Sequence, residues 1–153
     1  MAGRIYSHPI CEDVMPRKMS VVRGMITELY YIPFRIREID SKMLEIRECM
    51  DVRGVNYDKI PSDGNGSTPN DTRLAVMCTK LKEMESERLR LMERDSAIRS
   101  QLHWLDLPAD DMRVVEAVYT TGSYYDAGSK IGYSKIQIYR RINEIYRKLA
   151  RYV

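Results

Sequence analysis

The sequence predicts an all-α protein, in which a long antiparallel helical hairpin resembling a coiled coil precedes a C-terminal trihelical helix-turn-helix module. Apolar residues recur at spacings of three and four along two long stretches, and a loop-forming segment separates these stretches. Cap and turn residues then divide the last third of the chain into short helices. We therefore expect a flexible N-terminal arm (1–18), a hairpin (19–106) and a C-terminal helix-turn-helix module (107–153).

The first long helix is predicted from about Ser20 to Met50. Its apolar positions form an a/d heptad seam, the pattern with which one helix packs along another. Pro33 lies inside this stretch and removes one backbone hydrogen bond, but the heptad phase continues past it. We therefore expect one kinked helix. The seam consists of Val22, Met25, Leu29, Ile32, Ile36, Ile39, Met43, Ile46 and Met50.

The second long helix is predicted from about Thr72 to Leu105, after a polar, glycine- and proline-containing loop at 52–71. Its seam has polar residues at two positions, Arg88 and Asp95. An antiparallel overlay of the two helices brings Arg88 near Asp40, which is a hypothetical ion pair. Trp104, near the end of this helix, is predicted to anchor the hairpin to the C-terminal module.

Several large apolar residues of the predicted hairpin fall outside its seam, so two helices alone would leave them exposed. A second copy of the hairpin would bury them, which predicts a homodimer or a higher homo-oligomer. The alternative is that the C-terminal module folds back over them. These residues are Tyr30, Phe34, Leu44, Leu89 and Met92.

The C-terminal module begins after Pro108, which ends the second long helix. A helix from Asp110 or Asp111 to about Thr120 is expected to bury one side. Ser123 then caps a short helix that runs to about Lys130, and Ser134 caps the terminal helix. The buried side of the first of these helices is predicted as Met112, Val115, Val118 and Tyr119.

The spacing of Gly128, Gly132 and Ile138 is that of a tight helix-turn-helix. Such a motif needs a small residue where its helices approach, a glycine at the turn and an aliphatic residue beyond it. An ordinary helical hairpin would use the same residues only as core. Charge favours DNA binding, because residues 130–153 hold seven basic residues and one acid, whereas residues 1–106 hold 17 of each sign.

In a helix-turn-helix the N-terminal part of the second helix meets base edges in the major groove. The base-reading candidates here are Lys135, Ile136, Gln137, Tyr139, Arg140 and Asn143. Among them, Arg140 suits bidentate reading of guanine and Gln137 that of adenine. The phosphate-binding candidates are Lys130, Tyr133, Ser134, Arg141 and Arg147.

Four further residues of the module have other interpretations. Lys148 and Arg151 are interpreted as a solvated helix end that favours the helix dipole. Tyr124 and Tyr125 suit either phosphate contacts or packing.

The sequence offers no pattern for catalysis. It has no nucleophile and base in a recognisable set, no metal-ligand spacing around its cysteines and no nucleotide-binding loop, so we expect neither an enzyme nor a cofactor or metal. No apolar run reaches the length of a membrane span, which predicts a cytoplasmic protein without a membrane partner.

Residues 108–150 resemble region 4 of sigma factors, which reads promoter DNA through a helix-turn-helix. A charged helical half before such a module resembles the phage late transcriptional regulators of the RinA and ArpU type. This resemblance implies a phage or prophage late-gene activator in a bacterial host cell, with double-stranded DNA and host RNA polymerase as candidate partners.

The chain departs from the sigma pattern in two places. Ala127-Gly128 replaces the usual Ile-Ala, which is expected to weaken packing of the short helix. The chain also has no counterpart of the sigma region that binds core polymerase and melts the promoter, so the resemblance implies a regulator and not a complete sigma factor.

Two alternatives to a regulator remain open. A phage small terminase subunit also joins a helix-turn-helix to a helical oligomerisation core, although such proteins usually carry the DNA module first. The other alternative is a helical adaptor whose basic helix binds an acidic protein.

Overall fold

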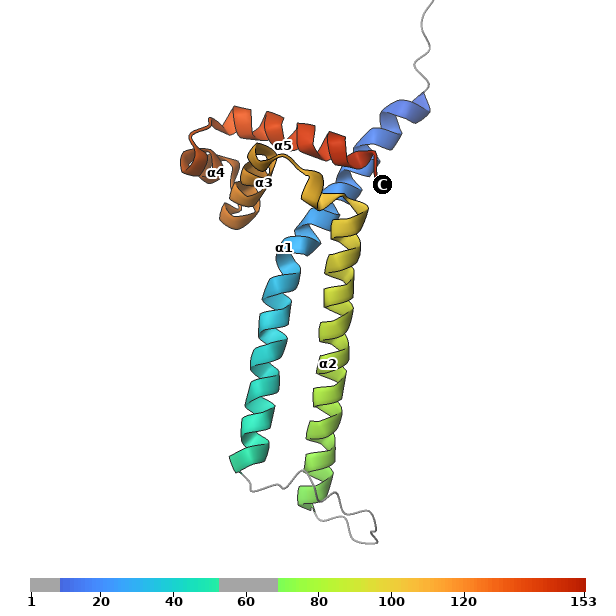
Figure 1. Cartoon of the computed structure of the whole chain (residues 1–153), viewed down its shortest axis with the longest axis vertical. Helices are drawn as coiled ribbons and strands as arrows, with labels where there is room; N and C mark the ends of the chain where they lie inside the picture. Colours follow the sequence, from blue (N-terminus) through green and yellow to red (C-terminus); the bar gives the residue numbers. More distant parts are fainter. Residues whose placement is uncertain (1–8, 53–68) are drawn as a thin grey trace, which may run out of the picture. The chain divides into compact units, whose positions relative to one another are not determined.

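The computed structural model describes residues 9–52 and 69–153, and every regular element in these ranges is a helix (Figure 1). The all-α class is therefore confirmed. Residues 1–8 of the predicted arm and most of the predicted loop at 52–71 lie outside these ranges. The elements are α1 (Pro9–Val52), α2 (Pro69–Gln101), the 3-10 turn η1 (Trp104–Asp106), α3 (Ala109–Thr121), α4 (Tyr124–Ile131) and α5 (Lys135–Ala150).

Helix α1 begins earlier than predicted, because residues 9–18 of the expected arm are helical. Pro9 is compatible with the first helical position, where a backbone N–H would have no partner within the helix. The helix continues through Pro33 to Val52, in agreement with one helix in place of two.

The chain divides into two compact units. Unit 1 combines residues 1–31 with 95–153, and unit 2 consists of residues 32–94. This division differs from the predicted boundary at 106–107, since both long helices contribute to both units. The division in α1 falls between Tyr31 and Ile32, next to Pro33.

The core of unit 1 joins distant parts of the sequence. Ile26 of α1 and Ile98 of α2 are fully buried in the same apolar cluster as the inward residues of α3, α4 and α5. Trp104 is buried in this cluster, as predicted for an anchor. The N-terminal half of α1 therefore completes a core that the sequence assigned to the C-terminal module alone.

Helix α2 ends four residues before the predicted Leu105. His103 has a left-handed backbone with a φ of 49°, which ends the α-helical hydrogen-bond ladder before η1. Leu105, predicted as a seam residue, is consequently 94% exposed.

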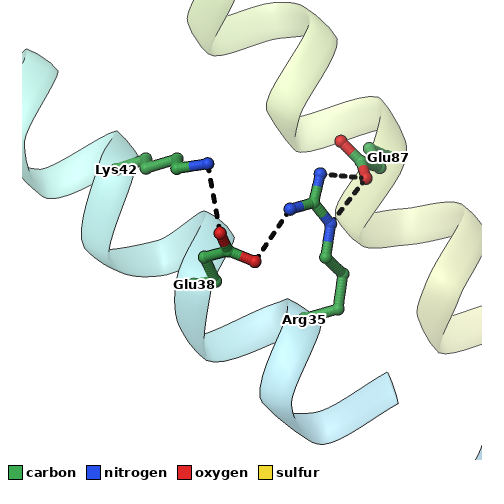
Figure 2. Close-up of polar contacts among 4 residues, drawn as sticks. All are labelled: Arg35, Glu38, Lys42 and Glu87. Carbon is green, nitrogen blue, oxygen red and sulfur yellow. Dashed lines mark hydrogen bonds and ion pairs between the residues drawn. The ribbon is translucent and has the colours of Figure 1, made fainter. Parts of the chain in front are cut away.

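In unit 2, ion pairs connect the segments of α1 and α2, which run in opposite directions (Figure 1). The predicted pair between Arg88 and Asp40 is confirmed, with Nε 2.8 Å from Oδ1. Figure 2 shows a second connection, in which the Arg35 guanidinium lies between Glu38 of its own helix and Glu87 of α2. Lys42 also contacts Glu38, at 3.3 Å.

The apolar side chains of unit 2 are unevenly covered. Ile39 and Met43 of α1 are buried, whereas the seam of α2 from Leu74 to Leu91 is only half-buried. The predicted off-seam residues of this unit are exposed: Phe34, Leu44, Leu89 and Met92. Tyr30, which was predicted with them, is half-buried against the core of unit 1.

Candidate nucleic-acid interface

Helix α3 supplies the packing surface for the two helices that follow it. Its fully buried apolar residues are Val114, Val115 and Ala117, whereas the predicted Met112, Val118 and Tyr119 are half-buried. The prediction missed Val114 and Ala117 because α3 packs against more than one neighbour and buries a broader face.

The start of α3 is tied to the end of α5 by an ion pair. Lys148 Nζ lies 3.1 Å from Oδ2 of Asp111, a carboxylate that is largely buried. Lys148 was interpreted as part of a solvated helix end, and it is indeed exposed in the last turn of α5, where it also makes this ion pair. Arg151 instead donates to the Tyr152 hydroxyl at 2.8 Å.

Helix α4 starts and ends as the sequence predicts. The Ser123 hydroxyl accepts a hydrogen bond from the backbone N–H of Asp126, at 3.4 Å. Gly132 takes the left-handed conformation, with a φ of 83°, and both its N–H and that of Tyr133 donate to the carbonyl of Gly128. The chain thereby turns within three residues from α4 toward α5.

Gly128 allows the close approach of α4 to the chain that follows it. A Cβ at this position would collide with the backbone carbonyl of Tyr133 and would lie 3.5 Å from Cγ1 of Ile138. We expected Ala127-Gly128 to weaken this packing. In the structure Ala127 is fully buried, and a larger residue at 128 would not fit in this close approach.

Helix α5 begins with a capping box. The Ser134 hydroxyl accepts from the backbone N–H of Gln137 at 3.2 Å, and the Gln137 side-chain oxygen accepts from the N–H of Ser134 at 2.8 Å. Reading adenine requires both the oxygen and the nitrogen of the glutamine amide. Gln137 therefore has to share or leave this contact before it can read adenine in the predicted way.

The two faces of α5 differ in chemistry. Its inward residues are buried, as the apolar spacing predicts, and they are Ile138, Ile142, Ile145, Tyr146 and Leu149. Ile136 and Tyr139 lie outside this face and are 63% and 54% exposed. Lys135, Gln137, Arg140 and Arg147 are exposed as well, and Asn143 is half-buried.

Four cations of this surface are not paired with a carboxylate of the described residues. Lys130, Lys135, Arg140 and Arg147 make no ion pair with any part of the chain that the structure describes. The Arg141 guanidinium lies over the half-buried ring of Tyr133, 5.2 Å from its centroid. Ser134 is exposed beside them.

Tyr124 of α4 packs against this surface. Its ring meets that of Tyr139 edge-on, with centroids 5.9 Å apart, so Tyr124 makes a packing contact, one of its two predicted roles. Tyr125, for which the sequence offered the same two roles, is exposed.

A tyrosine cluster that the sequence did not predict lies on the buried side of α5. The hydroxyls of Tyr119 and Tyr146 are 2.7 Å apart, and the Tyr30 ring stacks on that of Tyr119 at 5.1 Å. Burial raises the pKa of all three phenols. In the sequence, the burial of Tyr146 is signalled by its position four residues after Ile142, on the same face of the helix. The position of Tyr30 has no such local signal, because its partner Tyr119 is 89 positions away.

The sequence matches no family model, no curated protein and no solved structure. Across residues 9–52 and 69–153, none of the helices is both long and apolar enough to cross a membrane. In the same part of the chain, no three His, Cys, Asp or Glu residues are grouped so that they could hold a metal ion.

Proposed function

We propose that the protein is a sequence-specific regulator of transcription that binds double-stranded DNA and reads the major groove with α5. This proposal is based on four exposed cations of α4 and α5 that have no acidic partner among the described residues. They are Lys130, Lys135, Arg140 and Arg147. Uncompensated positive charge on one helix suits a polyanion. Two exposed apolar side chains beside it, Ile136 and Tyr139, suit the apolar edges of bases.

In the proposed complex, α4, the turn at Gly132 and α5 act as a helix-turn-helix. Arg140 is the candidate for guanine, and Ile136 and Tyr139 contact thymine methyl groups. Asn143 lies one turn further along α5, and the free amide nitrogen of Gln137 can donate to a base acceptor. Contacts to phosphates set the register of the helix and come from Lys130, Tyr133, Ser134, Arg141 and Arg147.

The specific form of this proposal is a late-gene activator of a phage or prophage, which acts in the bacterial cytoplasm with host RNA polymerase. Its support is the resemblance of residues 108–150 to sigma region 4, together with the charged helical half before them, which resembles the phage late regulators of the RinA and ArpU type. A small terminase subunit for DNA packaging would use the same basic helix, so the two functions are distinguished by the assembly that the protein forms.

The test begins with selection of bound sequences from random double-stranded DNA, followed by titration of the selected duplex. Arg140→Ala is expected to weaken binding about 5- to 150-fold, which corresponds to one bidentate base contact. Arg73→Ala is the matched control, because Arg73 is an exposed arginine of unit 2. Circular dichroism checks that both variants remain folded.

Equal binding by Arg140→Ala and the control would exclude base reading by Arg140. If the wild-type chain enriches no sequence and binds no duplex, the regulator proposal fails. An adaptor that binds an acidic protein would then be the better hypothesis.

We also propose that unit 2 associates with further copies of the chain. Five large apolar side chains of this unit are exposed, namely Phe34, Leu44, Val76, Leu89 and Met92, and unit 2 as a whole has no net charge to oppose association. Native mass spectrometry of the wild type is expected to show a dimer or a higher oligomer, and Leu89→Glu is expected to shift it toward the monomer. A wild-type monomer would contradict this proposal, and a closed ring of many subunits would favour the packaging function.

A further inference from the structure

A cleft in unit 1 opens beside the start of α5. Arg23 and Thr27 of α1 form one part of its lining, and Ser123, Tyr124 and Lys135 form another. The lining therefore brings α1 together with the N-terminal ends of α4 and α5. Neither of these α1 residues was predicted from the sequence to belong to the interface.

The lining of this cleft is cationic. Arg23 and Lys135 contribute positive charge, and no carboxylate belongs to the lining. Neither cation makes an ion pair within the described ranges, and both side chains are exposed. A cleft with two uncompensated cations favours an anionic ligand.

The remaining polar groups of the lining do not oppose an anion. Tyr119 and Tyr146 line the cleft as neutral phenols, because the ordinary pKa of a phenol is 10.0 and burial raises the pKa of both hydroxyls above it. The Thr27 hydroxyl already donates to the carbonyl of Arg23, at 2.7 Å. The two cations are therefore the principal partners for a ligand.

The cleft is continuous with the candidate base-reading surface. Lys135 is the first residue of α5, and Tyr124 contacts the exposed ring of Tyr139. An anion held in the cleft would lie beside the N-terminal end of α5, the end that meets base edges in a helix-turn-helix.

We infer that this cleft binds a backbone phosphate of the same DNA duplex, with Arg23 and Lys135 as its cationic partners. This inference rests on the proposed function and extends its interface to α1. A guanidinium donates two parallel hydrogen bonds to a phosphate, so Arg23 would fix the position of the duplex along α5. The contact carries no sequence information, and its energy depends on salt.

The experiment measures binding of the selected duplex as a function of salt concentration. The logarithm of the binding constant falls linearly with the logarithm of the salt concentration, and removing one phosphate contact makes this negative slope shallower by about 1. We expect this decrease for Arg23→Gln, and we expect Arg23→Lys to retain the wild-type slope. Arg73→Gln, which removes one charge from unit 2, is the matched control and is expected to leave the slope unchanged.

Ethylation of individual DNA phosphates provides a second measurement. Ethylation of one flanking phosphate is expected to impair binding by the wild type but not by Arg23→Gln or Lys135→Gln. Ethylation of the other contacted phosphates is expected to impair binding by the variants as it does by the wild type. This pattern distinguishes a lost contact from partial unfolding, which would weaken all contacts together.

Two results would overturn the inference in different ways. If the wild type binds the duplex and Arg23→Gln keeps the slope and ethylation pattern of the wild type, the cleft holds no phosphate and the regulator proposal stands. If the wild type binds no duplex at any salt concentration, the proposed function fails and the inference fails with it.

Discussion

Units 1 and 2 solve the same problem of burying helical apolar faces in different ways. In unit 1, Ile98, Ile138 and Ile142 are fully buried in one apolar cluster, to which all five α-helices contribute residues. In unit 2, the α2 seam stays half-buried and Phe34 remains 64% exposed. Unit 1 therefore has a closed core of its own, whereas the two helical segments of unit 2 have too few neighbours to close one.

The units also differ in the use of charge. Unit 2 holds equal numbers of basic and acidic residues, and several of its arginines pair with carboxylates across the two helices. The whole net charge of +3 belongs to unit 1, where the cations at the surface of α5 are mostly unpaired. Several charged side chains of unit 2 thus pair with one another across its helices, whereas most cations at the surface of α5 in unit 1 have no ion pair among the described residues and can contact a partner.

The largest expected effect tests the closed core. Ile142→Ala is expected to lower the free energy of unfolding by about 2–5 kcal/mol, because Ile142 is fully buried and its neighbours cannot fill the space. Leu81→Ala, in the half-buried seam of unit 2, is expected to cost less, about 1 kcal/mol. Urea unfolding measures both, and equal losses would remove the contrast between the units.

The next effect tests a close approach within unit 1. Gly128→Ala is expected to destabilise the protein by about 1–3 kcal/mol, because the added methyl group collides with the backbone at Tyr133. Gly24→Ala is the matched control in α1, where a Cβ meets nothing within 4 Å. The control is expected to stabilise by about 0.5–1 kcal/mol through helix propensity. Thermal unfolding of the two variants shows whether each substitution raises or lowers the melting temperature. Stabilisation by Gly128→Ala would contradict the observed packing.

A smaller effect concerns the tyrosine cluster. Tyr146→Phe is expected to cost about 0.5–1.5 kcal/mol, because it removes the hydrogen bond to the Tyr119 hydroxyl. The folded-state pKa of both phenols lies above the ordinary value of 10.0, so the native state keeps protons that the unfolded state loses. Their contribution to stability is therefore present below pH 10 and declines above it. Urea unfolding at several alkaline pH values should show a shallower decline for Tyr146→Phe than for the wild type.

The smallest effect belongs to the ion pairs of unit 2. Hydrogen bonds from Arg35 and Lys42 lower the pKa of Glu38 below its ordinary value of 4.5. Its stabilising contribution is thus present above this pH and is lost as the pH falls through the folded-state value. Because the pair is exposed, Glu38→Gln is expected to change stability only slightly near neutral pH and to flatten the acid side of the stability profile. Glu48→Gln, at an exposed glutamate of the same helix, is the control; an identical change in both variants would rule out a specific contribution from Glu38.

The sequence by itself determined the local features of the C-terminal helices. Ser123, Gly132 and Ser134 act as caps and turn as predicted, because each depends on groups only a few positions away. The Arg88–Asp40 pair was also predictable, since a regular heptad pattern on both helices fixes how they overlay.

Only the tertiary structure decided which segments share a core. It brought Val22 and Ile26 of α1 to the C-terminal helices, stacked Tyr30 on Tyr119, and placed Arg23 in a cleft with Lys135. Apolar periodicity states which face of a helix is buried but not which partner covers it, because many partners satisfy the same pattern. Choosing among them depends on the combined packing of all the helices, which no single stretch of sequence contains.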